Sequence, residues 1–254
     1  NISVSYREYI VWAWRIIMSE NGIRINKYLS AAGFCSRREA DRLVEAGRVS
    51  IDGRIAGMGD KVSDGQKVQV DNKDISVEEE KILLVFNKPA GIVCTTTDSQ
   101  GANNIVDYIG YNKRIYPVGR LDKDSHGLIL MTNNGEIMDK ILRSANGHEK
   151  EYIVEVNKDI DDEFVKNMSK GVYLEELERT TLPCRVYKDG KRKFRIILTQ
   201  GLNRQIRRMC DNLGYRVVDL KRIRIMNIVL GDLKEGSYRN VTDKEYSRLL
   251  SMLN

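Results

Sequence analysis

Residues 23–70 carry the first clear pattern of apolar and polar positions along the chain. Ser36 and Glu39 have the spacing of a capping box, in which each side chain bonds a free backbone N–H at the start of a helix. Apolar side chains then recur at helical spacing. Two short strands are predicted beyond this helix, at 49–51 and 66–70. The pattern therefore predicts a small α+β module.

A charged stretch at 71–81 (DNKDISVEEEK) lacks an apolar period and is predicted to be a linker. The pattern beyond it predicts a larger α+β domain over 82–254. Its expected strands are 82–86, 128–132, 152–156, 194–199 and 225–230, and its expected helices lie near 136–143, 161–169 and 203–213. A last helix is expected from Thr242, where Thr242 and Glu245 form a second capping box.

Residues 1–22 precede the patterned part of the chain. The sequence begins with Asn1 instead of Met, and Met18 lies just before the first pattern. We therefore expect 1–22 to be a non-native or disordered extension without a functional part. Its apolar stretch at 9–18 contains Arg15 and is shorter than the ~20 residues of a membrane span. No association with a membrane is expected.

The composition is that of a globular protein, with 41% hydrophobic and 31% charged residues. Lys and Arg number 42 against 36 acidic residues, a net charge of +6, so the position of the excess matters more than its size. The four cysteines are far apart and form no CxxC pair, which favours reduced thiols in the cytoplasm. Two histidines exclude a His-rich metal site.

The small module has a basic helix start. Arg37, Arg38 and Arg42 surround it, and Arg24 and Lys27 lie just upstream. A helix N-terminus beside guanidinium groups is suited to a phosphate backbone, because both bind anions. Acidic neighbours on the same helix equally allow a solvated surface without a ligand.

A second basic segment spans 200–211 (QGLNRQIRRMCD). Its apolar side chains fall on one helical face, so Arg204, Arg207 and Arg208 are expected on the opposite face. An exposed basic helix is the alternative, but the density of arginine favours a nucleic-acid surface.

The segment 118–128 (VGRLDKDSHGL) places a carboxylate where a loop meets an apolar strand. Asp122 follows Arg120 closely, and a carboxylate beside guanidinium stays ionised and can act as a nucleophile or a base. A polar turn with a structural ion pair would show the same residues. His126 alone is expected to be a loop side chain.

Several motifs in one order resemble the pseudouridine synthases of the RsuA/RluB/RluE/RluF group, over nearly the whole chain from residue 23. GRLDKDSHGL resembles the signature R-L-D-x-x-[ST]-x-G-L, NKPAG at 87–91 the N-K-P-x-G segment, and Lys150-Glu-Tyr152 the K-x-Y motif. QGLNRQIRRM resembles the arginine-bearing helix of the group, and the module at 23–70 resembles an S4 domain. The F-type enzymes of the group, which act on 23S rRNA, are most similar in three further segments: KILRSANGHEKEY at 140–152, RRMCDNLGY at 207–215 and RIMNI at 224–228.

The resemblance implies an S4 RNA-binding domain at 23–70 and, after the linker, a catalytic domain with a mixed, largely antiparallel sheet. It also implies an isomerisation without cofactor or metal: the C1′–N1 bond of a uridine breaks, the uracil turns, and a C1′–C5 bond forms. Asp122 is the implied catalytic carboxylate, as a nucleophile or as a base for a sugar proton. Arg207 is implied to hold Asp122 ionised through a charge-assisted pair, and Tyr152 to stack on the uracil.

Further residues are implied to bind the substrate. In the catalytic domain they are Lys88, Arg120, Arg204 and Arg208, with Lys88 and Arg120 lining the cleft; in the S4 domain they are Arg24, Lys27, Arg37, Arg38 and Arg42. The expected partner is 23S rRNA, alone or in a ribosome assembly intermediate, with tRNA as a second possible substrate. We expect a monomer in the cytoplasm. A catalytically silent S4-type RNA-binding or ribosome-assembly protein stays an alternative, as does a hydrolase that would release free uracil.

Overall fold

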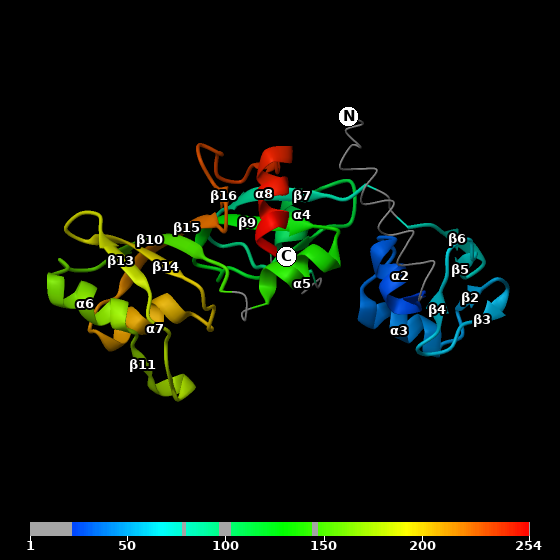
Figure 1. The fold of residues 1–254 in the computed structure, drawn as a ribbon, viewed down its shortest axis with the longest axis horizontal. Coiled ribbons are helices and arrows are strands. Elements are labelled where there is room, and N and C mark those ends of the chain that lie inside the picture. Colours follow the sequence, from blue (N-terminus) through cyan, green and yellow to red (C-terminus); the bar gives the residue numbers. More distant parts are fainter. Residues whose placement is uncertain (1–21, 78–79, 97–102, 144–146, 254) are drawn as a thin grey trace. The chain divides into compact units, whose positions relative to one another are not determined.

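The first unit of the chain sets two helices against short strands (Figure 1). The structure, a computed structural model, describes residues 22–77, 80–96, 103–143 and 147–253, so the extension expected at 1–22 lies outside the described residues except for its last one. The elements of this unit are β1 (Ile23–Arg24), α2 (Ile25–Ala31), α3 (Arg37–Glu45), β2 (Val49–Ile51), β3 (Arg54–Ile55), β4 (Lys61–Val62), β5 (Val68–Val70) and β6 (Lys73–Ile75). The strands pair in the orders β3-β2-β5-β6 and β1-β4.

Helix α3 begins as its sequence predicts. The Ser36 hydroxyl accepts the backbone N–H of Glu39 at 3.2 Å, which satisfies one of the free donors at the helix start. Ala40, Leu43 and Val44 on one side of α3 are buried in the core of the unit. Helix α2 was not predicted, because its seven residues are too few to show a helical period.

The stretch expected to be a linker begins with a strand, and this part of the prediction was wrong. Strand β6 pairs antiparallel with β5 across the two-residue turn Asp71-Asn72. Both turn residues have positive φ, 49° and 63°, the backbone that a tight hairpin turn requires. Lys73 and Asp74 are exposed, so the strand shows no apolar alternation. The Asp-Asn turn was the signal that could have revealed it.

The second unit contains a nine-stranded mixed sheet. Its elements are β7 (Leu83–Lys88), α4 (Ile105–Ile109), β8 (Tyr116–Pro117), β9 (His126–Thr132), α5 (Gly135–Leu142), β10 (Lys150–Val156), α6 (Asp162–Lys170), β11 (Tyr173–Leu174), η2 (Glu175–Leu177), β12 (Arg179–Thr180), β13 (Arg185–Lys188), β14 (Lys193–Leu198), α7 (Gln205–Asn212), β15 (Val217–Ile225), β16 (Ile228–Val229), β17 (Tyr238–Asn240) and α8 (Asp243–Leu253). The expected strands and helices other than 225–230 are found within a few residues of their predicted positions.

The sheet is largely antiparallel, as expected. Its order is β13-β14-β10-β15-β9-β7-β17, with β16 beside β15 and β8 beside β9. Strands β15 and β9 pair in parallel, through Lys221 with His126 and Arg222 with Gly127, and the other described pairs of this sheet are antiparallel. His126 therefore opens strand β9, and the expectation of a loop side chain was wrong. The parallel pair brings β10 within one strand of the 118–128 segment.

The expected single strand at 225–230 is a hairpin instead. Strand β15 ends at Ile225, the chain turns at Met226 with φ of 51°, and β16 returns with Ile228 opposite Ile225. The run of apolar side chains concealed the turn, because it continues on both sides of it. The long strand before the turn was missed because charged side chains interrupt its apolar positions.

Helices cover the sheet on the side that will hold the site. Phe164 of α6 packs on Phe194 of β14, with ring centroids 5.2 Å apart, and Figure 1 shows α6 and α7 along the same side of β10, β13 and β14. Leu249 and Leu253 of α8 join a core of buried side chains from β7, β9 and α5. No described helix has the length and apolar character that a membrane crossing needs.

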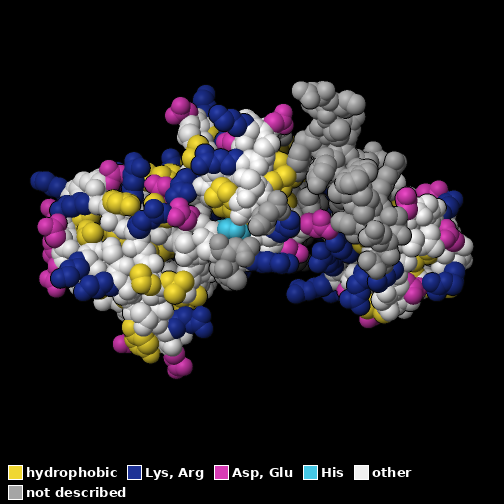
Figure 2. Space-filling view, in the orientation of Figure 1, with side chains coloured by type: hydrophobic (Ala, Val, Ile, Leu, Met, Phe, Trp, Pro, Cys, Tyr) yellow, Lys and Arg dark blue, Asp and Glu magenta, His cyan; other side chains and the backbone are white. Residues whose placement is uncertain are grey.

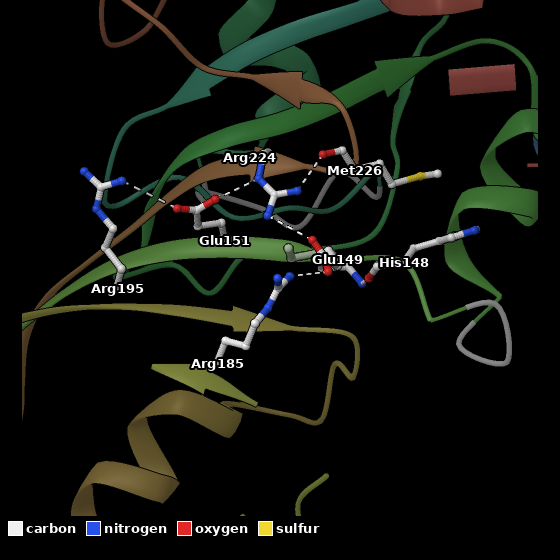
Figure 3. A network of polar contacts seen from close by, with 8 residues as sticks. His148, Glu149, Glu151, Arg185, Arg195, Arg224 and Met226 are labelled. Carbon is white, nitrogen blue, oxygen red and sulfur yellow. Dashed lines mark hydrogen bonds and ion pairs between the residues drawn. The ribbon is translucent and has the colours of Figure 1, made fainter. Parts of the chain in front are cut away.

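The opposite face of the same strands carries a network of ion pairs (Figure 3). Arg224 of β15 donates to Glu151 at 2.7 Å and to Glu149 at 3.1 Å. Arg185 of β13 also binds Glu149, and Arg195 of β14 lies 3.7 Å from Glu151. Because side chains alternate along a strand, the positions between these glutamates face the other side of the sheet.

Candidate active site

The 118–128 segment forms a loop that ends where β9 begins. The N–H of Ser125 donates to the carbonyl of Asp122 at 3.1 Å and closes a turn around the acidic pair. The N–H of Leu121 donates to the Cys94 sulfur at 3.4 Å, which ties the front of the loop to a neighbouring segment. Asp122 is therefore presented from a turn that is held at both ends.

Lys88 supports this loop from beneath. Its side chain is fully buried, and its ammonium donates to the carbonyls of Pro89 and Ile92, each at 2.9 Å, and to that of Lys123 at 3.4 Å. The N–H of Gly91 also donates to the Lys123 carbonyl, at 2.7 Å. Burial lowers the pKa of Lys88. The prediction that Lys88 lines the cleft was wrong, because its three carbonyl partners hold it inside the fold.

Helix α7 supplies the guanidinium groups of the site. Arg207 donates to the Ser125 hydroxyl and to the Asp124 carbonyl, both at 3.2 Å. The ion pair with Asp122 comes from Arg204 instead, at 3.8 Å, and Arg204 lies equally far from the Asp124 carboxylate. The expected pair between Arg207 and Asp122 is thus replaced, because Arg207 is bound to the backbone and hydroxyl of the turn.

The backbone of α7 explains the position of Arg204. This residue precedes the first turn of the helix and has φ of 51°, in the left-handed region. Gln205, which is buried, accepts the N–H of Leu202 at 3.0 Å and holds the chain in this bend. Sequence reasoning missed Gln205, although a glutamine directly after a Gly-containing turn is a usable signal for such a bond.

A cleft of about 240 Å³ gathers the predicted catalytic residues. Tyr152, on β10, is 9% exposed and lines this cleft. Among the other predicted residues, Arg120, Asp122, Arg204 and Arg207 also line it. A second hollow, of about 360 Å³, shares Arg120, Asp122 and Arg204 with the first. Asp122 therefore borders both spaces.

Four further basic side chains line the cleft and were not among the predicted site residues. They are Arg143, His148, Lys150 and Arg222. Lys150 precedes Tyr152 by two positions and so faces the same side of β10. Arg222 is 3% exposed and lies on β15 directly opposite Tyr152 in the ladder. A basic residue on the inward side of a predicted strand would have indicated Arg222. The sequence analysis did not predict strand β15, so this signal was missed.

The remaining predicted basic residues fall outside the cleft. Arg208 forms an ion pair with Glu176 and donates to the carbonyl of Asn203 at 3.0 Å, so it serves the structure of α7. In the first unit, Arg24, Arg37, Arg38 and Arg42 are exposed, and Lys27 is half-buried. Figure 2 shows Lys and Arg side chains gathered over this unit near α3. Arg42 pairs with Glu39 at 3.1 Å, whereas Arg37 and Arg38 form no ion pair with another described residue.

Two protein-family models match the chain. The family model described as RNA pseudouridylate synthase matches residues 82–212, and the S4 domain model matches residues 23–68. A solved structure described as a pseudouridylate synthase superimposes with a TM-score of 0.66 at 26% identity, over 89% of this chain and 99% of that chain.

Curated relatives are similar over most of the chain. The dual-specificity RNA pseudouridine synthase RluF of Escherichia coli (strain K12) is 47% identical over 239 residues, which are 93% of this chain and 81% of the relative. The ribosomal large subunit pseudouridine synthase B of Bacillus subtilis (strain 168) is 31% identical over 235 residues, 90% of this chain and 96% of the relative. The predicted resemblance to the F-type enzymes is confirmed. With its S4 domain followed by a synthase domain, the chain belongs to the family of RNA pseudouridine synthases.

Proposed function

We propose that this protein isomerises a specific uridine in 23S rRNA to pseudouridine, with tRNA as a second possible substrate. The observation that carries the proposal is the cleft in which Asp122, Tyr152 and Arg207 come together. The names of its relatives support the substrate class: one is a dual-specificity RNA pseudouridine synthase, and another acts in the ribosomal large subunit. Substrate and product are isomers, so the reaction itself requires no group donor.

Asp122 is the group proposed to start the reaction. The Arg204 guanidinium lies 3.8 Å from its carboxylate. The carboxylate then attacks the sugar at C1′, or removes a sugar proton, and in either route the C1′–N1 bond breaks. The ring of Tyr152 stacks on the uracil while it turns. The target nucleotide must leave its stack to enter the cleft, which costs a few kcal/mol.

Arg207 is proposed as a positioning residue. It holds the Ser125 hydroxyl and the Asp124 carbonyl, and the same turn carries Asp122. A side chain that fixes the turn fixes the direction of the carboxylate, and misplacement by about 1 Å can cost about 100-fold in rate. The charge of Arg207 adds to that of Arg204 in a cleft that receives an anionic nucleic acid.

The S4 unit is proposed to bind the RNA backbone through Arg37 and Arg38. We expect the double variant Arg37→Gln/Arg38→Gln to weaken RNA binding and to flatten its salt dependence, because each lost phosphate contact lowers the slope of log K against log salt by about 0.7 to 0.9. Filter binding of 23S rRNA fragments at several salt concentrations measures this slope.

The matched control is Arg48→Gln/Arg54→Gln. It removes the same charge from the same unit, but Arg48 is already bound to Asp71 at 2.9 Å and Arg54 to Asp60 at 2.7 Å. We expect its salt slope to stay close to that of the unchanged protein. Equal slopes for the two double variants would mean that net charge, not contact by Arg37 and Arg38, carries the binding.

The proposed substrate also bears on where the protein acts and on which form of the RNA it acts. We propose that it acts as a monomer in the cytoplasm, on free 23S rRNA or on a ribosome assembly intermediate. Both forms of the RNA belong in the assay, since folding and bound proteins decide whether the target uridine can be extruded.

Tritium release from 23S rRNA labelled at uridine C5 tests the function. The isomerisation replaces the C5–H bond by the C5–C1′ bond, so we expect label in water, pseudouridine in the nucleoside digest and no free uracil. Free uracil would identify a hydrolase of the glycosidic bond. Tight binding without release of label, on naked and partly assembled RNA, would identify a silent RNA-binding protein.

A further inference from the structure

Arg222 lies at the centre of the sheet, where two ladders meet. It is the partner of Tyr152 on β10 on one side and of Gly127 on β9 on the other. Its Nε donates to the carbonyl of Leu128 at 2.6 Å, while its Nη2, which is buried, has no hydrogen-bond partner among the described residues. The side chain is 3% exposed and lines the cleft.

Lys150 adds a second, half-buried cation to the same wall. Its ammonium donates to the carbonyl of His148 at 3.3 Å. Burial and, secondly, the charge of Arg222 lower the pKa of Lys150. No carboxylate of the described chain forms an ion pair with either side chain, although buried charges are ordinarily paired. The wall beside Tyr152 is therefore positively charged.

The reaction proposed above generates an anion at this wall. When the C1′–N1 bond breaks, the electron pair stays on N1, and the negative charge spreads over N1, O2 and O4 of the uracil. C5 then attacks C1′. In the nucleophilic route this attack breaks the C1′–O bond to Asp122, and in the base route Asp122 returns the proton to the sugar. The C5 proton leaves and N1 takes up a proton, so atoms and charge balance. The anion forms whether Asp122 attacks the sugar or removes a sugar proton.

We propose that Arg222, together with Lys150, stabilises the uracil anion that forms when the C1′–N1 bond breaks. The inference rests on the proposed function. Fixed charges in a cleft that excludes water stabilise developing charge more strongly than they would in water. Both cations occupy the wall beside Tyr152, which is proposed to stack on the base.

A backbone phosphate is the other anion that Arg222 could bind. Its burial argues against this ligand: the Arg222 side chain lies within the sheet, whereas that of Arg204, at the cleft, is 42% exposed. A flipped base enters the protein while the phosphates stay outside. The uracil oxygens are therefore the ligands that this position favours.

Single-turnover kinetics of Arg222→Gln test the proposal. With uridine in the target site, we expect the rate of pseudouridine formation to fall about 100-fold, while the Kd for RNA changes by less than about twofold. With 5-fluorouridine in that site, the fluorine makes the departing N1 anion less basic, so we expect a clearly smaller loss. Disappearance of the fluorinated nucleoside from the digest measures its cleavage.

The control is Lys221→Gln, on the same strand with its side chain on the opposite face of the sheet. It should leave both rates unchanged. Equal losses of Arg222→Gln on uridine and 5-fluorouridine would indicate a structural role and overturn the proposal. Loss of affinity and of salt slope at an unchanged rate would assign a phosphate to Arg222 and overturn it as well.

Lys150→Gln keeps the proposal falsifiable if Arg222→Gln does not fold. We expect this variant, too, to lose more rate with uridine than with 5-fluorouridine in the target site. Equal losses with the two nucleosides would again overturn the proposal. The unchanged protein is assayed in parallel. If it forms no pseudouridine, the proposed function is wrong. If it is active but Arg222→Gln loses the same rate on uridine and on 5-fluorouridine, only the proposed anion site is wrong.

Discussion

Asp122→Asn is expected to abolish pseudouridine formation while the affinity for RNA is kept. Asparagine has nearly the same size as aspartate, but it can neither attack C1′ nor accept a sugar proton as a carboxylate does. We expect the rate to fall by about 10⁴-fold or more. Loss of one negative charge beside Arg204 leaves the cleft more positive, so binding of the RNA should not weaken. Tritium release and filter binding on the same preparation measure both quantities.

Asp124→Asn is the matched control for this variant. The Asp124 carboxylate lies 3.8 Å from Arg204, as does that of Asp122, so both variants remove one charge from the same guanidinium. The Asp124 side chain is 65% exposed, against 30% for Asp122, and Asp124 lines neither of the two hollows that Asp122 borders. We expect Asp124→Asn to keep its activity within a few-fold. Comparable losses in the two variants would show that the charge on Arg204, not the chemistry of Asp122, limits the rate.

Gly127→Ala is expected to destabilise the synthase unit by more than about 3 kcal/mol. Gly127 has φ of 98°, and a Cβ there would lie 2.3 Å from the carbonyl oxygen of Arg222. This atom belongs to the backbone of β15, so the two strands of the parallel pair would have to separate. Thermal unfolding followed by circular dichroism measures the loss of stability. Any fraction of the variant that folds should also form pseudouridine slowly, because Arg222 would move.

Gly91→Ala distinguishes backbone strain from collision. Gly91 has φ of 89°, similar to that of Gly127, but a Cβ there would meet no atom within 4 Å. Its replacement should cost only about 1 to 2 kcal/mol, the strain of a left-handed backbone. If both variants lost the same stability, the close approach of β9 and β15 would not be what requires glycine at position 127.

Much of the proposed catalytic set was predictable from short motifs. Asp122 follows an arginine at the end of a loop, Tyr152 alternates with apolar residues along a strand, and Arg207 lies on the polar side of a helical pattern. Each of these is a local property of the chain, because helical and strand periods place side chains on faces without knowledge of the partner. The prediction of an S4 module followed by a synthase domain rested on the order of the same motifs.

The partners of these residues were not predictable in the same way. Arg204, not Arg207, reaches Asp122, because Arg207 is bound to Ser125 and the turn. Lys88 faces three carbonyls inside the fold instead of the cleft. Long flexible side chains can reach in several directions from one position, and the surrounding segments decide which direction satisfies buried polar groups.

The sequence by itself determined most of the elements and the residues that are proposed to carry the chemistry. Only the tertiary structure decided that β15 lies between β10 and β9, and hence that Arg222 stands beside Tyr152 and Gly127. Strand order depends on pairings between segments far apart in the chain, whereas periodicity reports only on neighbours. The charge of the cleft wall is therefore a property of the assembled sheet.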